Sequence, residues 1–379
     1  MHKEFISFTQ KTFNTEEFIP LHAPIFIGNE KKYLNECIDS TFVSSVGKFV
    51  DQFEVNIAKY TGAKHAIATS NGTSALHIGL LMAGVTKDDE VITQPLTFIA
   101  TCNAISYIGA HPIFVDVDKD SLGLSPEKLE HFLINNTEII NGECINKLSK
   151  RKIKAVVPMH TFGFSVKIDD IVSVCEKFYI KVVEDAAESL GSYYKGKHTG
   201  TFGLIGVFSF NGNKTITTGG GGMLITNDDN IAIKAKHITT TAKIPHCWDY
   251  EHDMIGFNYR LPNINAALGC AQLEKLSLIL ERKKVLSKKY EVFFKDKSIK
   301  YIKGIQESNS NFWLNTILLE NLEERNNFLK QTNRVGVMTR PIWKLMNKLV
   351  MFKHAQIGNL DNAEWLEERV VNIPSSVIL

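Results

Sequence analysis

Residues 205–214 have the sequence Ile-Gly-Val-Phe-Ser-Phe-Asn-Gly-Asn-Lys, and four consecutive glycines follow at 219–222. The apolar residues predict a buried strand, and the glycines indicate backbone conformations that other residues adopt with difficulty. Lys214 therefore follows a buried strand, away from the charged neighbours of a solvated face. An amine removed from water loses proton affinity and becomes a usable nucleophile. The alternative is an ordinary lysine at the tip of a turn, and the rest of the chain has to decide between the two.

Short apolar runs alternate with helical patterns from about residue 64 onward. Such alternation requires crossover connections and is typical of a mainly parallel sheet that is sandwiched by helices. The sequence therefore predicts an α/β fold. The predicted strands are 65–69, 91–93, 112–117, 155–158, 181–184, 207–210 and 223–226, and the predicted helices are 73–83, 98–108, 169–178 and one that begins at Pro126 after the cap Ser125.

The alternation fades beyond residue 250. Residues 266–287 have helical apolar spacing and predict one long helix, which shorter mixed elements follow. Residues 135–154 are rich in Asn, Lys and Ser and predict a surface connection. We therefore expect a large domain over residues 1–250 and a smaller α+β domain over residues 251–379.

The composition is that of an ordinary globular protein, with 44% hydrophobic and 22% charged residues in a chain of 379. The net charge of +2 argues against a nucleic-acid-binding protein. The six cysteines contain no Cys-x-x-Cys pair, so the sequence gives no indication of a metal site. Neither a signal peptide nor a membrane-spanning apolar stretch is recognisable, and we expect a cytoplasmic protein without a membrane partner.

Two groups of residues follow predicted strands at points where ligands bind to parallel sheets. The first is Ser-Asn-Gly-Thr-Ser at 70–74, where the backbone N–H groups of a helix start and the hydroxyls of Thr73 and Ser74 favour an anion such as a phosphate ester. Simple helix capping is the other interpretation. The second is Phe98 at the start of the next predicted helix, where a flat aromatic ring could stack on a ligand ring or belong to the core.

Asp185 ends the predicted strand 181–184 and is partly desolvated there unless it is paired. Glu184 is the competing carboxylate, but strand alternation points it to the opposite face of the sheet. A buried carboxylate can keep the ring nitrogen of pyridoxal phosphate protonated and so make that cofactor a strong electron sink. Glu188 lies close enough in sequence to reach the phenolic oxygen of the same ring. An ordinary helix-capping role is the alternative for Asp185.

Two further residues complete this candidate site. Ser209 ends the strand before Lys214, and its hydroxyl could join a phosphate site. His160 follows the predicted strand 155–158 and could line a substrate pocket, although a structural histidine is the alternative. With Lys214 as the amine that forms a Schiff base with an aldehyde, these residues predict a pyridoxal phosphate enzyme.

These motifs together resemble the DegT/DnrJ-type sugar-nucleotide aminotransferases, which depend on pyridoxal phosphate. That family is a branch of the aspartate aminotransferase fold, also called fold type I. The resemblance covers nearly the whole chain in a specific order. Its motifs are PIFIG at 24–28, NGTSALH at 71–77, TFIAT at 97–101, EDAA at 184–187, FSF at 208–210 with Lys214, GFNYRLP at 256–262 and AALG at 266–269.

The resemblance implies a role for each candidate residue. Lys214 would bind the cofactor aldehyde, Asp185 would face the pyridine nitrogen, and Phe98 would stack on the ring. Asn258 would reach the phosphate of the cofactor in a partner subunit, which implies a homodimer, and Arg260 would contact substrate or phosphate. The phosphate ligands implied are Thr73, Ser74 and Ser209. Glu188 departs from the family pattern, because many members have Gln or His at this position, and its cofactor contact is therefore an open point.

The resemblance further implies transfer of an amino group from L-glutamate to carbon 4 of a nucleotide-linked 4-keto-6-deoxy sugar. Residues 26–30, 40–48 and 211–214 are most similar to enzymes that act on UDP-4-keto-6-deoxy-N-acetylhexosamines, so UDP-4-keto-6-deoxy-N-acetylglucosamine is the expected substrate. A GDP- or dTDP-linked sugar is the alternative. A non-catalytic sugar-nucleotide-binding homologue is disfavoured by the presence of Lys214 and Asp185. A nicotinamide-dependent dehydrogenase is disfavoured because residues 223–226, which follow the glycines, predict a strand where that motif needs a helix.

Overall fold

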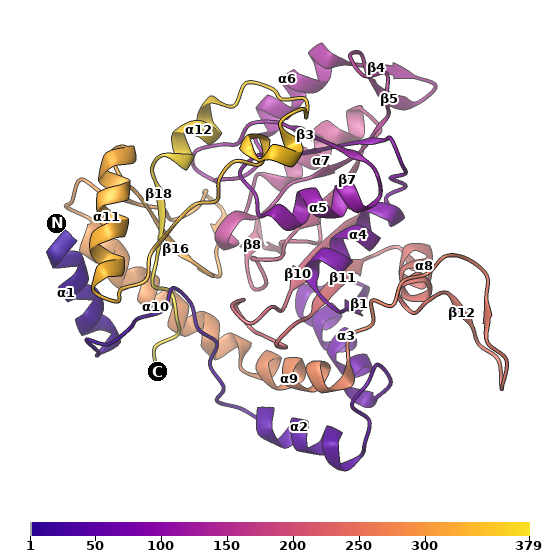
Figure 1. Ribbon diagram of the computed structural model, residues 1–379, viewed down its shortest axis with the longest axis horizontal. Coiled ribbons are helices and arrows are strands. Elements are labelled where there is room, and N and C mark those ends of the chain that lie inside the picture. Colours follow the sequence, from indigo (N-terminus) through magenta and orange to yellow (C-terminus); the bar gives the residue numbers. More distant parts are fainter. Residues whose placement is uncertain (1) are drawn as a thin grey trace.

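The computed structural model describes residues 2–379, and its centre is a seven-stranded sheet (Figure 1). Six strands run in the same direction, whereas β11 is antiparallel to both of its neighbours. The predicted mainly parallel α/β sheet is therefore confirmed. In spatial order the strands are β1 (His65–Thr69), β11 (Gly222–Thr226), β10 (Ile205–Ser209), β7 (Lys181–Asp185), β6 (Ile153–Val157), β2 (Glu90–Thr93) and β3 (His111–Phe114).

Helices cover both faces of this sheet because successive side chains of each strand point to opposite sides. Val183 packs in one hydrophobic cluster with α4, α5 and α8, whereas its neighbour Val182 packs in another with α6 and α7. A third cluster joins Phe208 on the second face to α3 and α9. The helices are α3 (Lys48–Thr61), α4 (Gly72–Met82), α5 (Ile99–Tyr107), α6 (Pro126–Asn136), α7 (Ile168–Lys177), α8 (Asp229–Thr239) and α9 (Asn263–Glu274).

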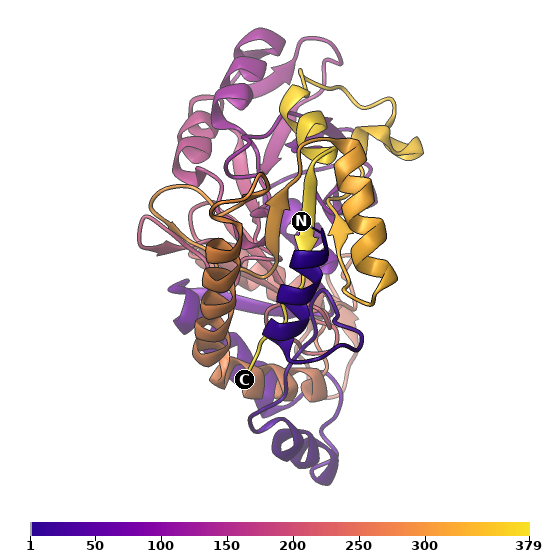
Figure 2. The same cartoon turned by 90° about the vertical axis from the view of Figure 1, so that its left-hand side faces the viewer.

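The C-terminal part contains an antiparallel sheet with helices, as expected for an α+β unit. The N-terminal helix α1 (His2–Phe13) lies beside this part (Figure 2), and its fully buried Phe5 packs against Tyr290 and Phe328. This contact crosses the expected boundary near residue 250, and the division into two domains stays a prediction. The elements are α10 (Leu276–Phe294), β14 (Lys300–Tyr301), β16 (Asn315–Leu318), α11 (Leu322–Arg334), β17 (Arg340–Pro341), η2 (Met346–Lys348), η3 (Val350–Phe352), α12 (Asp361–Glu367) and β18 (Val370–Ile373).

One expectation about the second half of the chain was wrong, and one about the middle of the chain was incomplete. The helix expected over residues 266–287 is two helices, α9 and α10, because the helical path breaks at Lys275; α9 and the start of α10 pack in one cluster, whereas the rest of α10 packs in another. The surface connection expected over 135–154 contains a hairpin of β4 (Thr137–Ile140) and β5 (Glu143–Asn146). Asn141 and Gly142 form its turn with φ of 52° and 78°, which is the pair that such tight hairpins favour.

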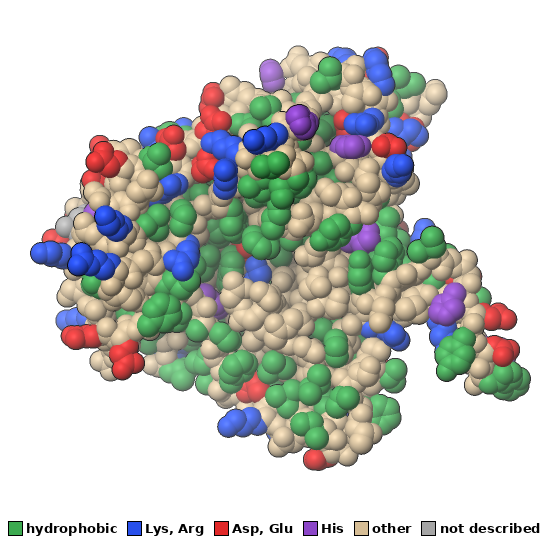
Figure 3. Space-filling model, viewed as in Figure 1, with side chains coloured by type: hydrophobic (Ala, Val, Ile, Leu, Met, Phe, Trp, Pro, Cys, Tyr) green, Lys and Arg blue, Asp and Glu red, His purple; other side chains and the backbone are tan. Residues whose placement is uncertain are grey.

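Several elements were not predicted from the sequence. The hairpin of β12 (Lys243–Ile244) and β13 (Glu251–His252) extends away from the body of the molecule, and Figure 3 shows hydrophobic side chains at its tip. Trp248 and Tyr250 on this hairpin are exposed.

Within the described part of the chain, no helix combines the length and the apolar character that a membrane span requires. The remaining elements are α2 (Glu30–Asp39), η1 (Thr161–Gly163), β8 (Tyr193–Tyr194), β9 (Lys197–His198) and β15 (Ser308–Asn309).

Candidate active site

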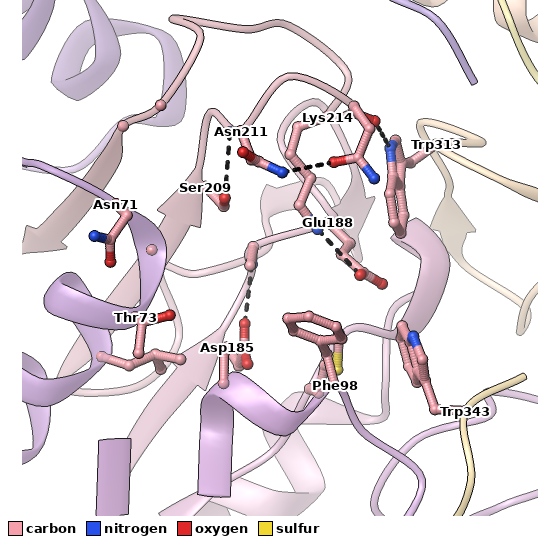
Figure 4. Close-up of a pocket in the computed structure, with 18 residues that line it drawn as sticks. Asn71, Thr73, Phe98, Asp185, Glu188, Ser209, Asn211, Lys214, Trp313 and Trp343 are labelled. Carbon is pink, nitrogen blue, oxygen red and sulfur yellow. Dashed lines mark hydrogen bonds and ion pairs between the residues drawn. The ribbon is translucent and has the colours of Figure 1, made fainter. Parts of the chain in front are cut away.

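A cavity of about 310 Å³ lies where β1, β7 and β10 end, at the edge where parallel sheets bind ligands. Most of the residues expected to act together meet here, although they are spread over more than a hundred positions of the sequence (Figure 4). The segments after the three strands and the start of α4 line one part of the wall, and aromatic side chains line the rest. The predicted residues that line the cavity are Thr73, Phe98, Asp185, Glu188, Ser209 and Lys214.

Lys214 reaches this cavity from the loop between β10 and β11. Its side chain is only 14% exposed, and its Nζ lies 3.1 Å from Oε1 of Glu188. The same nitrogen lies 4.1 Å from the ring centroid of Trp313, so a cation there also faces an aromatic surface. These contacts support the interpretation of Lys214 as an amine shielded from bulk water.

Asp185 is fully buried at the end of β7. Its Oδ2 accepts a hydrogen bond from the Thr101 hydroxyl at 2.7 Å, and its Oδ1 accepts one from the Ala187 backbone N–H at 3.2 Å. Loss of hydration raises the pKa of Asp185, because burial disfavours the charged form more than the two hydrogen bonds favour it. Both donors are uncharged, so this carboxylate can still gain stability from a cation in the cavity.

Glu184 and His160 lie together on the opposite side of β7. Nε2 of His160 lies 2.9 Å from Oε2 of Glu184, and both side chains are fully buried. His160 is not among the cavity-lining residues, so its placement favours the structural alternative over a substrate contact. Asp185 lines the cavity and Glu184 does not, which confirms that the two side chains point to opposite faces of the sheet, as alternation along the strand predicted.

The start of α4 forms the second wall of the cavity. Asn71 caps this helix, and its Oδ1 accepts the Ser74 N–H at 2.8 Å. Thr73 faces the cavity, whereas Ser74 is buried with its hydroxyl 3.3 Å from that of Ser70 and is not a lining residue. Gly72 allows a close approach, since a Cβ there would lie 2.9 Å from the Cβ of Ser209. The start of α4, with the Thr73 hydroxyl, therefore lines the same cavity as the Ser209 hydroxyl, an arrangement that suits an anion.

Aromatic rings close the cavity on the remaining side. Phe98 precedes α5, is 48% exposed and lies 6.1 Å from Trp343, measured between ring centroids. Trp313 and Trp343 belong to the C-terminal part and were not identified from the sequence. The indole N–H of Trp313 donates to the backbone oxygen of Asn213 at 2.7 Å and so fixes the loop that carries Lys214. The sequence offered one signal for these two residues, the rarity of tryptophan, which occurs four times in the chain.

Asn258 and Arg260 lie outside this cavity. Nε of Arg260 donates to Oδ1 of Asn258 at 3.2 Å, and Arg260 lines a separate cavity of about 170 Å³. Asn258 is exposed on the surface. Within a single chain, the structure therefore does not bring either residue to Lys214.

The sequence profile of the DegT/DnrJ/EryC1/StrS aminotransferase family matches residues 25–379, and the chain belongs to this family. GDP-perosamine synthase of Escherichia coli O157:H7 is 37% identical over 363 residues, which are 95% of this chain and 93% of the relative. GDP-perosamine synthase of Caulobacter vibrioides is 37% identical over 361 residues, with 94% and 93% covered.

Solved structures give the same result for the fold. A DegT DnrJ EryC1 StrS aminotransferase from Brucella abortus is 27% identical with a TM-score of 0.82, over 92% of this chain and 90% of that one. Helicobacter pylori PseC, described as an aminotransferase involved in pseudoaminic acid biosynthesis, is 26% identical with a TM-score of 0.84, over 94% of each chain. The expected fold type I of pyridoxal phosphate enzymes is thereby confirmed, as is the family.

Proposed function

We propose that this protein transfers an amino group from L-glutamate to carbon 4 of a GDP-linked 4-keto-6-deoxy sugar. Membership of the family makes the protein an aminotransferase, and pyridoxal phosphate is its cofactor. The observation that carries the proposal is the meeting of Lys214, Asp185 and Glu188 in one cavity of a chain from this family. A non-catalytic homologue would have no need to keep a shielded amine beside two buried carboxylates.

The nucleotide is the point at which the sequence-based expectation changes. The expected substrate was UDP-4-keto-6-deoxy-N-acetylglucosamine, but relatives that match nearly the whole chain are named GDP-perosamine synthases in three organisms. These names support the alternative, a GDP-linked sugar whose amination gives an amino sugar of the perosamine type. We therefore propose a GDP-linked 4-keto-6-deoxy hexose as the amino-group acceptor.

The residues of the cavity suit pyridoxal phosphate in charge as well as in position. The fully buried carboxylate of Asp185 has only uncharged donors, so a protonated ring nitrogen would supply its counter-charge. The start of α4, with Thr73 and Ser209, would hold the phosphate. Phe98 would pack against the flat ring, and the Lys214 amine, which faces the same cavity, would bind the aldehyde.

Bound pyridoxal phosphate supplies an aldehyde that carries the amino group and a ring that accepts electrons during proton transfer. Lys214 would hold the cofactor through Nζ and would be released when glutamate takes its place. The freed amine would take the proton from Cα of glutamate and give it up again before the first half of the reaction ends, and in the second half it would deliver a proton to carbon 4 of the sugar. Asp185 would favour both halves, because its negative charge would stabilise a protonated ring nitrogen. The low exposure of this cavity wall keeps competing water away from the amine.

A direct assay with two nucleotides tests this function. The purified protein, loaded with pyridoxal phosphate, is incubated with L-glutamate and either GDP-4-keto-6-deoxymannose or UDP-4-keto-6-deoxy-N-acetylglucosamine. Mass spectrometry of the nucleotide sugars then measures the product. We expect the GDP-linked sugar to be aminated with the higher kcat/KM. Preference for the UDP-linked sugar would overturn the proposed substrate, and no amination of any nucleotide sugar would overturn the proposed function.

Two copies of the chain would share their sites in a homodimer. Asn258 is exposed and lies away from the cavity of its own chain, which suits a contact with the cofactor phosphate of a partner subunit. Trp248 and Tyr250 are 76% and 81% exposed and would be covered in such an assembly. Mixing the inactive variants Lys214→Ala and Asn258→Ala should restore activity, because one of the two hybrid sites keeps both residues. No restoration after subunit exchange would contradict the shared site.

A further inference from the structure

Glu188 is held more firmly than a cofactor contact alone would require. Its side chain is buried, and Oε2 accepts the backbone N–H of Phe162 at 2.9 Å. The Asn311 side-chain amide donates to the backbone oxygen of Glu188, also at 2.9 Å. The Phe162 contact occupies Oε2 and leaves Oε1 as the oxygen that faces Nζ of Lys214, at 3.1 Å. The carboxylate is therefore aimed at one partner, the Lys214 amine.

The donor that aims Glu188 has a strained backbone. Phe162 is fully buried and has φ 57° and ψ 14°, a left-handed conformation that is unusual for a bulky residue. The next residue, Gly163, has φ 95°, and a Cβ there would lie 1.9 Å from Oδ1 of Asn311. Strain of this kind persists where the surrounding structure imposes it, and it concentrates at functional sites. Here the strained turn presents its N–H to Glu188.

A second buried glutamate in the same segment provides the comparison. Glu184 is fully buried, and its two oxygens accept three backbone N–H groups, from Gly200, Phe202 and Gly203, while His160 lies 2.9 Å away. These contacts fix both oxygens of the Glu184 carboxylate. Glu188 has one backbone donor and one partner that can itself gain or lose a proton. The two glutamates therefore differ in their contacts, because Glu184 is held by backbone donors whereas Glu188 faces the Lys214 amine.

We propose that Glu188 exchanges a proton with Lys214, so that the amine is neutral when it must act as a base. This inference rests on the proposed function. In the exchange, one N–H bond of the Lys214 ammonium breaks, an O–H bond forms on Oε1 of Glu188, and no electrons leave the pair. The reverse transfer restores the ammonium and the carboxylate.

The surroundings of Glu188 let this carboxylate hold a proton near neutral pH. Burial raises the pKa of Glu188 to about 7, and the negative charge of Asp185 adds to the increase. The Lys214 cation and the Phe162 N–H act in the opposite direction. Removing the Lys214 cation must therefore raise the pKa of Glu188 further. This sign gives a test that does not depend on enzyme activity.

Infrared spectroscopy of the full-length chain without added cofactor measures the protonation of Glu188. In protein labelled with ¹³C-glutamate, the C=O band of a protonated glutamate shifts, whereas that of Asp185 does not. Glu54 also has a raised pKa, and the Glu54→Gln variant removes its contribution. We expect a shifted band that titrates near neutral pH and that persists to higher pH in Lys214→Ala. No labelled band at neutral pH, or equal midpoints in both proteins, would overturn the proposal.

The loaded enzyme gives the second readout. Rapid mixing with L-glutamate changes the visible absorbance of the cofactor, and the rate of this change is measured against pH. We expect Glu188→Gln to keep the visible absorbance, to react at least tenfold more slowly and to lose the rise in rate that accompanies deprotonation of Glu188. Glu54→Gln, the matched control, should keep the wild-type profile. A Glu188→Gln profile that superimposes on the wild type would overturn the proposal, whereas a wild-type protein that does not react with glutamate would overturn the function instead.

Discussion

Replacing Thr101 with valine tests how the fold maintains the charge of Asp185. Thr101 is buried on α5, and its hydroxyl is one of the two donors to the fully buried carboxylate among residues 2–379. Valine has nearly the same shape but cannot donate. The substitution should therefore leave the packing intact, destabilise the charged form of Asp185 and raise its pKa further above the usual range.

The expected size follows from the 2.7 Å hydrogen bond. A hydrogen bond to a charged group contributes about 2 kcal/mol, which corresponds to a pKa change of about 1.5. Because burial already raises the pKa of Asp185, the folded protein binds this proton more readily than the unfolded chain does. As pH rises, Asp185 loses its proton and the free energy of unfolding falls. Thr101→Val makes this loss of stability larger. The full loss is present above the raised pKa of the folded protein and shrinks as pH falls toward about 4, the unfolded value.

Thermal unfolding of the chain without cofactor measures this effect. With about 2.1 cal/mol/K of unfolding entropy per residue, a loss of 2 kcal/mol lowers the Tm of the 379-residue chain by about 2–3 °C at pH 8. Thr101→Ser keeps the hydroxyl and serves as the control, with a smaller loss that does not depend on pH. The reasoning would be refuted if Thr101→Val lost the same stability at pH 5 as at pH 8, or if it lost no more than Thr101→Ser at pH 8.

Two other substitutions have defined outcomes. Asp185→Asn should keep pyridoxal phosphate bound but lower kcat about 100-fold, because the amide does not stabilise a protonated ring nitrogen. Steady-state kinetics at saturating cofactor measures this change. A near-normal kcat would show that another group sets the ring charge. Gly206→Ala should lower the free energy of unfolding by about 2–3 kcal/mol, because its Cβ would lie 2.0 Å from the Gly200 backbone oxygen. Gly212→Ala, whose Cβ would have its nearest neighbour at 3.9 Å, is the matched control in denaturant unfolding, and equal losses in both variants would contradict the steric argument.

The central sheet was predictable because the information for it is local. Each strand of the sheet spans four or five residues and contains a short apolar stretch, and the turns between strands and helices carry recognisable caps such as Ser125. The site residues at strand ends followed from the same reasoning, since parallel strands bring their carboxyl ends to one edge. The hairpin at Asn141 and Gly142 also had a local signal, the Asn-Gly pair, which the polar composition of the segment obscured.

The rest of the site depends on long-range packing, which leaves little local signal. Trp313 and Trp343 reach the cavity only because the C-terminal part folds against the large sheet. The break at Lys275 between α9 and α10 has the same origin, since the apolar spacing continues through it. His160 ends a strand as the functional residues do, but its ring is directed to the other face, where it meets Glu184.

Buried lysines show the same limit of sequence reasoning. Lys283 lies in the middle of α10, where its sequence neighbours predict a solvated face, yet its side chain is fully buried. Its Nζ donates to the backbone oxygens of Phe312, Trp313 and Ser375, and burial lowers its pKa to about 7. The chain therefore contains a second amine with unusual surroundings, although this one lies outside the cavity.

Reductive trapping of the cofactor distinguishes these two amines. The protein is incubated with pyridoxal phosphate, reduced with borohydride and digested, and the modified peptide is identified by mass spectrometry. We predict that the cofactor is attached to Lys214 and that Lys214→Ala carries no label. Attachment to Lys283 or to any other lysine, with Lys214 unmodified, would contradict the account of this site.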